Sequence, residues 1–266
     1  MRHALFLPLF DELADPRVVA RLAAEAEAAG WDGAFVWDHV AYRAPVQAVG
    51  DPWVALSAMA VTTERLRLGP MVTPLARRRP VKTARETASL DVLSGGRLVL
   101  GVGLGGDRAR ELSATGEQVD DRVRARMLDE HLEVLAAAWT GEPVRHRGEH
   151  YVVDDLRLLP TPVQRPGPPV WVGVRFGNTR PLARAARHDG VFPVDLHGPD
   201  QLAELVAGVQ ARRADPSAPY DVAVEGRPGT DWAAYGAVGA TWCLTSFPYD
   251  GVTLDAVRGA LRDGPG

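Results

Sequence analysis

Short apolar runs alternate with helical patterns from one end of this 266-residue chain to the other. The apolar runs predict eight strands, at residues 3–9, 33–37, 66–72, 97–103, 170–174, 190–194, 220–225 and 241–246. Apolar residues at helical spacing predict a helix after each strand, at residues 16–29, 51–63, 79–93, 121–139, 179–187, 199–213, 231–239 and 253–262. This alternation, without a break in composition, favours an α/β fold of the closed (β/α)8 TIM barrel type over an open sheet, as a single domain over residues 1–266. A proline-rich excursion at residues 140–169, between the fourth helix and the fifth strand, predicts a surface loop under the barrel, with a substrate-gating role as the alternative.

The bulk charge and composition exclude several classes of partner. The net charge is −4 at pH 7, and the only run of like charge lies at residues 77–79, so neither nucleic acid nor an anionic membrane is an expected partner. No apolar run approaches the length of a membrane span, and the first residues lack a signal-peptide pattern. A single cysteine, Cys243, excludes an internal disulfide. These features predict a cytoplasmic protein.

Polar side chains follow the predicted strands at the end where parallel barrels build their active sites. Asp38 and His39 come directly after the strand at 33–37 and are the leading candidates for catalysis, since a histidine titrates near neutral pH. Three aromatic residues nearby, and an aspartate after the sixth strand, are predicted to line the substrate side: Trp37, Tyr42, Trp53 and Asp195. The arginines at 77–79 follow the third strand and are interpreted as partly solvated.

Two glycine-containing segments on the same rim are candidate ligand sites. Residues 101–106 have the spacing of a dinucleotide fingerprint, but no helix opens on the last glycine, which excludes a Rossmann fold. Gly103 and Gly105 either let a flat ligand lie against the backbone or form a simple tight turn. Residues 173–180 lead into a helix and predict a phosphate site, with ordinary helix capping as the alternative. The candidate phosphate-binding residues are Gly173, Arg175, Gly177, Asn178, Thr179 and Arg180.

The sequence gives little support to metal-dependent catalysis or to acyl transfer. Asp38, His39, Asp195 and His197 could converge across a barrel, but no metal-binding motif supports them, so no metal ligand is predicted. A nucleophile elbow is missing from the sequence, and Cys243 lies within a predicted strand, which disfavours acyl transfer. A metal-dependent barrel hydrolase remains as an alternative hypothesis.

Several segments, in order, resemble the luciferase-like monooxygenase family of bacterial flavin- and F420-dependent oxidoreductases. The resemblance covers nearly the whole chain to about residue 195, and is carried by residues 30–33, 37–39, 68–74, 79–80, 86–87, 93–97, 100–103, 148–151 and 168–173. It implies FMN or coenzyme F420 as the cofactor, with its ring in the barrel mouth facing Asp38 and His39. It further implies that Met71, Val72 and Thr73 form a bulge behind the ring. Some members have a non-proline cis peptide in that bulge, which would fall here near Pro70 and Met71.

The resemblance implies hydride transfer, or oxygen insertion with reduced FMN, on a small organic molecule. It also implies a flavin reductase partner if FMN is a free substrate, and a homodimer. Sugar-phosphate dehydrogenases of this family carry a glutamate where this chain has Gly106, and Glu111 lies too far along to be assumed as its replacement. The alternative within the family is a non-catalytic flavin-binding subunit.

Overall fold

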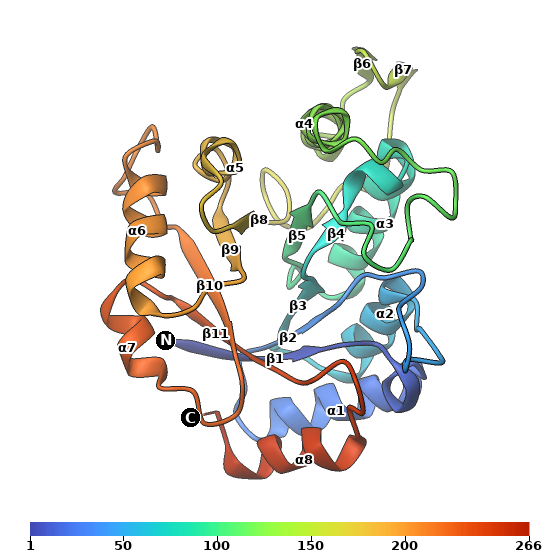
Figure 1. The fold of residues 1–266 in the computed structure, drawn as a ribbon. Helices are drawn as coiled ribbons and strands as arrows, with labels where there is room; N and C mark the ends of the chain where they lie inside the picture. Colours follow the sequence, from blue (N-terminus) through green and yellow to red (C-terminus); the bar gives the residue numbers. More distant parts are fainter. Residues whose placement is uncertain (266) are drawn as a thin grey trace.

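A ring of parallel strands with helices around it forms the centre of the protein, as a computed structural model shows (Figure 1). The structure describes residues 1–265, apart from the side chain of Thr179. Within them the nine-stranded sheet has the order β3-β2-β1-β11-β10-β9-β8-β5-β4. Its strands are β1 (Arg2–Leu7), β2 (Gly33–Val36), β3 (Arg67–Pro70), β4 (Thr73–Pro74), β5 (Leu100–Gly103), β8 (Val170–Arg175), β9 (Gly190–Val194), β10 (Asp221–Gly226) and β11 (Trp242–Ser246).

The edge strand β3 also bonds to residues 97–99, the segment that leads into β5, and this contact closes the ring. The Leu68 amide on β3 donates to the Arg97 carbonyl at 3.2 Å, and the Val99 amide donates back to the Leu68 carbonyl at 2.9 Å. The predicted third strand is divided into β3 and β4 by a cis peptide bond between Met71 and Val72, one residue after the expected position. The prediction of a TIM barrel is therefore confirmed, with one strand interrupted.

Eight α-helices among the described residues surround the ring and lie close to the predicted ranges. They are α1 (Pro16–Ala28), α2 (Pro52–Thr62), α3 (Pro80–Leu93), α4 (Asp121–Trp139), α5 (Thr179–Ala185), α6 (Pro199–Gln210), α7 (Trp232–Ala237) and α8 (Leu254–Asp263). The Asp-Pro pairs fix two of the starts, because Asp15 accepts from the Arg17 amide and Asp51 accepts from the Val54 amide. Across the described residues, none of the helices is both long and apolar enough to span a membrane.

Successive side chains along each strand point alternately into the barrel and toward the layer under the helices. On β10, Ala223 belongs to the inner cluster, whereas Val222 and Val224 belong to the outer core. Large aromatic side chains fill the interior, and the rings of Trp171 and Trp242 lie 5.5 Å apart. Because the middle of the barrel is packed, a ligand site has to be built at a rim.

The excursion at 140–169 contains a hairpin that the sequence analysis missed. Strands β6 (Val144–Arg147) and β7 (Val152–Leu156) pair antiparallel and lie beyond α4, outside the ring (Figure 1). The Glu130 carboxylate on α4 accepts from the amides of His150 and Tyr151 at 2.9 and 2.7 Å, which holds the hairpin in place. The hairpin is short and mostly exposed, so its sequence carries little hydrophobic alternation.

Candidate active site at the barrel rim

The residues predicted from strand ends share one rim of the barrel. Because the barrel strands run parallel, their carboxyl ends lie at the same end of the ring. Asp38 and His39 follow β2, Thr73 starts β4, Gly103 ends β5 and Gly177 follows β8. The structure therefore brings together the positions that the sequence analysis selected from four separate strands.

Asp38 is the centre of a buried ion-pair network. Its carboxylate is fully buried and accepts from Arg77 Nη2 and from Arg78 Nη2, each at 2.7 Å. Arg78 Nε in turn donates to Thr73 Oγ1 at 2.9 Å. Asp38 and Thr73 thus lie beneath the rim surface, and the expectation that they face a cofactor stays a prediction. The side chains of Arg77 and Arg78 are mostly covered because each is paired with Asp38, whereas Arg79 is exposed, so the arginine run is partly solvated.

His39 is held by Glu111, the residue that the sequence analysis set aside. Glu111 Oε2 lies 2.8 Å from His39 Nδ1, and Glu111 Oε1 accepts from the Val40 amide at 2.7 Å and from Arg77 Nη1 at 3.1 Å. Burial by itself would raise the pKa of Glu111, but the hydrogen bond and charge of His39, the Val40 amide and Arg77 outweigh it, so the pKa lies below its usual value. An ionised carboxylate can only accept, so Nδ1 of His39 carries the proton.

This arrangement leaves Nε2 of His39 available for chemistry. Within the described residues, no protein group bonds Nε2, and the side chain is 27% exposed. A neutral imidazole with its proton on Nδ1 presents Nε2 as an acceptor, and a protonated one presents it as a donor. His39 can therefore hold or move a proton at the rim.

Glu111 reaches His39 because the loop between β5 and α4 folds back over the rim. Asp107 Oδ1 accepts from the amides of Leu112 and Ser113 at 2.9 and 3.0 Å, which forms the turn that carries Glu111. A motif search does not find such a residue, since its neighbour His39 is 72 positions away in the chain. The available signal was the length of the loop, residues 104–120, because long loops after barrel strands often carry function.

Aromatic side chains enclose His39. The ring centroid of His39 lies 4.8 Å from Tyr42, 5.8 Å from Trp37 and 5.9 Å from Phe10. Trp37 and Tyr42, predicted to wall the substrate side, thus lie beside the histidine. Trp53 does not belong to this group: it is buried on α2, with its ring 5.3 Å from the Arg78 guanidinium carbon.

The glycines of the rim pack against protein side chains, and the approach of a flat ligand to Gly103 and Gly105 stays a prediction. A Cβ on Gly103 would come within 2.5 Å of Val72 Cγ2, and one on Gly173 within 3.2 Å of Val72 Cγ1. Gly105 adopts a φ of +69° next to Pro74, as expected for a tight turn. Val72 is therefore the side chain that the glycines of β5 and β8 seat on the rim, directly after the cis peptide. Met71 is buried in the inner cluster and does not reach the rim surface.

A second acidic group lies on the other side of the barrel mouth. Arg175 at the end of β8 pairs with Asp195 after β9 at 3.3 Å, and both side chains are about half exposed. Glu225 follows Ala223 on the inner face of β10, where Ser246 Oγ lies 3.4 Å from its Oε1. Burial is the main cause that raises the pKa of Glu225, and the Asp195 charge adds to it. The sequence analysis missed Glu225, although the alternation of that strand places it inward.

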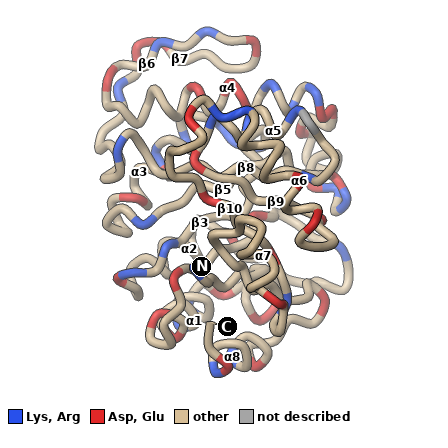
Figure 2. The backbone as a smooth tube through the Cα atoms, turned by 90° about the vertical axis from the view of Figure 1, so that its left-hand side faces the viewer, with Lys and Arg blue, Asp and Glu red and all other residues tan. Residues whose placement is uncertain are grey.

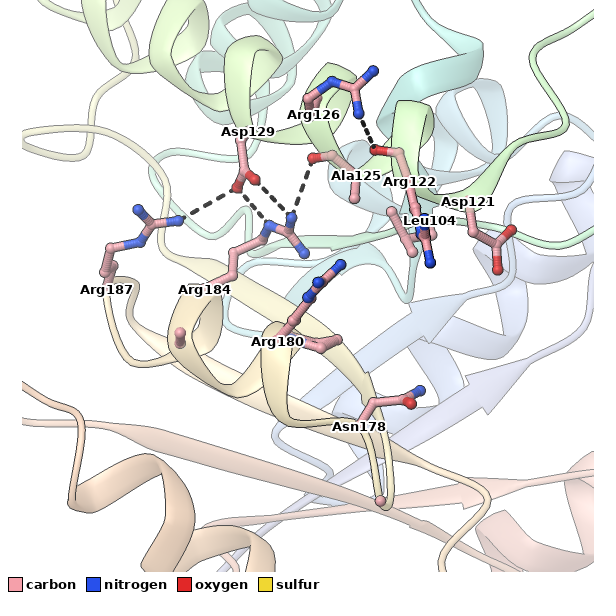
Figure 3. Close-up of a pocket in the computed structure, with 13 residues that line it drawn as sticks. Leu104, Asp121, Arg122, Ala125, Arg126, Asp129, Asn178, Arg180, Arg184 and Arg187 are labelled. Carbon is pink, nitrogen blue, oxygen red and sulfur yellow. Dashed lines mark hydrogen bonds and ion pairs between the residues drawn. The ribbon is translucent and has the colours of Figure 1, made fainter.

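A cleft of about 840 Å³ lies between α4 and α5, where basic residues occur on both helices (Figure 2). Leu104, Gly177, Asn178 and Arg180 line it, so part of the predicted phosphate segment borders this cleft (Figure 3). Gly177 has a φ of +85°, and Asn178 makes no side-chain capping bond to α5. The side chain of Thr179, also predicted to bind phosphate, lies outside the described part of the chain.

The metal alternative receives no support from the geometry. Within residues 1–265, apart from the Thr179 side chain, no three His, Cys, Asp or Glu side chains are grouped so that they could hold a metal ion. Asp38 is fully engaged by two arginines, and Asp195 pairs with Arg175. The four residues that could have converged therefore do not form a ligand set.

The fold and the rim define a parallel (β/α)8 barrel with a proton-handling histidine and an adjoining basic cleft. A family model described as luciferase-like monooxygenase matches residues 5–230. The chain belongs to this family, which confirms the resemblance found in the sequence.

Solved structures show the same fold at low sequence identity. Monooxygenase RslO1 from Streptomyces bottropensis aligns with a TM-score of 0.81 and 19% identity, over 98% of this chain and 97% of that one. The coenzyme F420-dependent tetrahydromethanopterin reductase from Methanopyrus kandleri aligns with a TM-score of 0.76 and 17% identity, over 99% and 98%. The oxygenating constituent of 3,6-diketocamphane monooxygenase from Pseudomonas putida, in complex with FMN, aligns with a TM-score of 0.71 and 19% identity, over 85% and 67%.

Proposed function

We propose that this protein is an oxidoreductase that binds FMN or coenzyme F420 at the barrel rim and acts on a small organic molecule. The observation that carries the proposal is the His39–Glu111 pair, which leaves Nε2 of an aromatic-flanked histidine free at the rim. Family membership supports the class of reaction. Either cofactor, when bound, supplies hydride transfer, and reduced FMN also supports oxygen insertion.

The residues present at the rim fit a flat heterocycle with an anionic side chain. Val72 lies over the glycines of β5 and β8, where a Cβ would collide with it at Gly103 and contact it tightly at Gly173. The indole Nε1 of Trp37 is buried and, within the described residues, without a hydrogen-bond partner, so it could donate to a ring heteroatom. Gly177 and Asn178 would lie beside the phosphate, at the entrance of the basic cleft.

Each residue has a distinct role in this proposal. His39 holds or moves the proton at Nε2, while Glu111 accepts from Nδ1 and fixes the orientation of the ring. Asp38 is a positioning residue that acts through Arg77 and Arg78. Trp37 and Tyr42 would exclude water from the substrate side.

The ordered His39–Glu111 contact also favours an enzyme over a non-catalytic flavin-binding subunit, because a subunit that only binds flavin does not need a histidine held by a buried carboxylate. The proposal has three further parts. A flavin reductase is a partner only if FMN arrives as a free substrate, and a homodimer follows from the family resemblance. A cytoplasmic location follows from the single buried thiol, Cys243.

The test is a titration of the purified protein with FMN and with F420, followed by absorbance and fluorescence. We expect binding of one of the two. His39→Gln should keep that affinity and lower turnover about 10²–10⁴-fold, the range for loss of a general acid or base. His197→Gln, an exposed histidine after β9, is the matched control and should leave turnover unchanged. Failure of both cofactors to bind at tens of micromolar would refute the proposal, and unchanged turnover of His39→Gln would favour the non-catalytic subunit.

A further inference from the structure

The cleft between α4 and α5 is strongly basic in a chain whose net charge is −4. Five arginines line it, against two aspartates, Asp121 and Asp129. The arginines are Arg122, Arg126, Arg180, Arg184 and Arg187. Such an excess of guanidinium groups in one concave site points to an anionic ligand.

Two of these arginines have no internal partner. Arg184 and Arg187 bind Asp129 at 2.6 and 3.4 Å, and Arg126 binds Glu149 at 3.1 Å. Within the described residues, no carboxylate lies within ion-pair distance of Arg122 or Arg180, and both side chains extend into the space between the helices (Figure 3). Their charges are therefore available to a ligand.

The position of the cleft indicates which part of a bound cofactor would reach it. Gly177 and Asn178, at the predicted phosphate site, form one end of its lining, while Arg122 and Arg126 lie across it on α4. A single phosphate would not use a cleft of about 840 Å³, which has the volume of a site for a whole small molecule. The side chain of FMN ends at its phosphate, whereas the side chain of F420 continues beyond a phosphodiester into several carboxylates. Arginine binds carboxylates well because its planar fork can pair with both oxygens.

We propose that the α4–α5 cleft binds the carboxylate-bearing tail of coenzyme F420, and that F420 is therefore the cofactor of this protein. This inference rests on the proposed function. The tail enters past Gly177 and lies along α4, so that its carboxylates pair with Arg122, which has no carboxylate partner among the described residues, and with Arg126, whose pair with Glu149 is exposed.

The experiment compares the affinities of four fluorescent ligands: F420 with several glutamates, F420 without glutamate, the deazaflavin riboside without phosphate, and FMN. We expect glutamate-free F420 to bind more tightly than the riboside, and glutamyl F420 to bind more tightly than glutamate-free F420. The gain from the glutamates should diminish as the salt concentration rises. In Arg122→Ala/Arg126→Ala, glutamyl F420 should bind roughly three- to tenfold more weakly, as for the loss of two exposed charge pairs. The other three ligands should bind within about twofold of wild type, since none reaches α4.

The control is Arg258→Ala/Arg262→Ala on α8, which has the same helical spacing and likewise removes one arginine that pairs with a glutamate, Glu25. It should leave every affinity unchanged. Tail-independent binding in the wild type, or an equal loss for FMN in the α4 variant, would overturn the cleft assignment while the proposed function stands. If none of the four ligands binds, the proposed function fails and the assignment fails with it.

Discussion

Replacing Asp38 by asparagine tests whether Asp38 serves to hold the buried ion-pair network or instead contacts the ligand. The substitution keeps the shape but removes the negative charge between Arg77 and Arg78, whose side chains are 7% and 18% exposed. Breaking a buried ion pair costs about 3–5 kcal/mol of unfolding free energy. Arg77 keeps Glu111 at 3.1 Å, so we expect the lower end of that range, about 3 kcal/mol. For a domain of this size that lowers the melting temperature by roughly 6–12 °C.

The assay is thermal unfolding followed by far-UV circular dichroism, with urea unfolding to obtain the free energy. Asp15→Asn is the matched control, because Asp15 also pairs with an arginine but lies at the exposed start of α1, where asparagine caps equally well. We expect little change in that variant. If Asp38→Asn melts no lower than the control yet loses activity, Asp38 contacts the ligand and the positioning role is wrong.

Two further predictions concern titratable groups whose pKa is shifted in the folded protein. Burial lowers the pKa of His131 on α4 to about 3, below its unfolded value of 6.5, so the unfolded state binds the extra proton between these values. The free energy of unfolding of the wild type should therefore fall by about 2 kcal/mol, through this residue, when the pH is lowered from 7 to 5. Urea unfolding at the two pH values should show that His131→Leu lacks this decrease. A wild-type pH slope retained in the variant would refute the burial argument. For Glu225 the pKa is raised, so its contribution to stability is present below the unfolded value and lost as the pH rises through the folded one. Glu225→Gln should be more stable than the wild type at pH 8 but not at pH 4. The difference in stability should be small because water reaches the side chain. An equal difference at both pH values would contradict this prediction.

The barrel and most of its rim were predictable because periodicity and strand ends are local features. The runs that became β1 and β2 read as buried strands, and the Asp-Pro pairs marked the starts of α1 and α2 within one residue. Which side chains meet across the rim was not predictable in the same way. Asp38 and His39 are adjacent in the chain, yet one is buried among arginines and the other is free at Nε2.

The residues that were missed depend on long-range folding. Glu111 is brought to His39 by the turn at Asp107, and nothing in the residues around it indicates that contact. Glu225 is different, because its position two residues after Ala223 places it inward by strand alternation. The glycines were also interpreted from their own flexibility, whereas Gly103 serves to admit Val72 from another strand.

The rim has two separate regions, one that handles a proton and one that leads into the basic cleft. Because different loops build the two regions, examining candidate residues one at a time does not reveal this division. The loop residues after β2 and β5 hold the proton-handling pair, with the carboxylate of Glu111 kept ionised by His39 and Arg77. The loops after β5 and β8 lead into the basic cleft, which contains neither His39 nor Glu111. A cofactor that spans both regions must be long, with a flat end near Val72 and an anionic end along α4. Substitutions on α4 should therefore change cofactor affinity without changing turnover at saturating cofactor, whereas changes at Glu111 should lower turnover because its carboxylate orients His39.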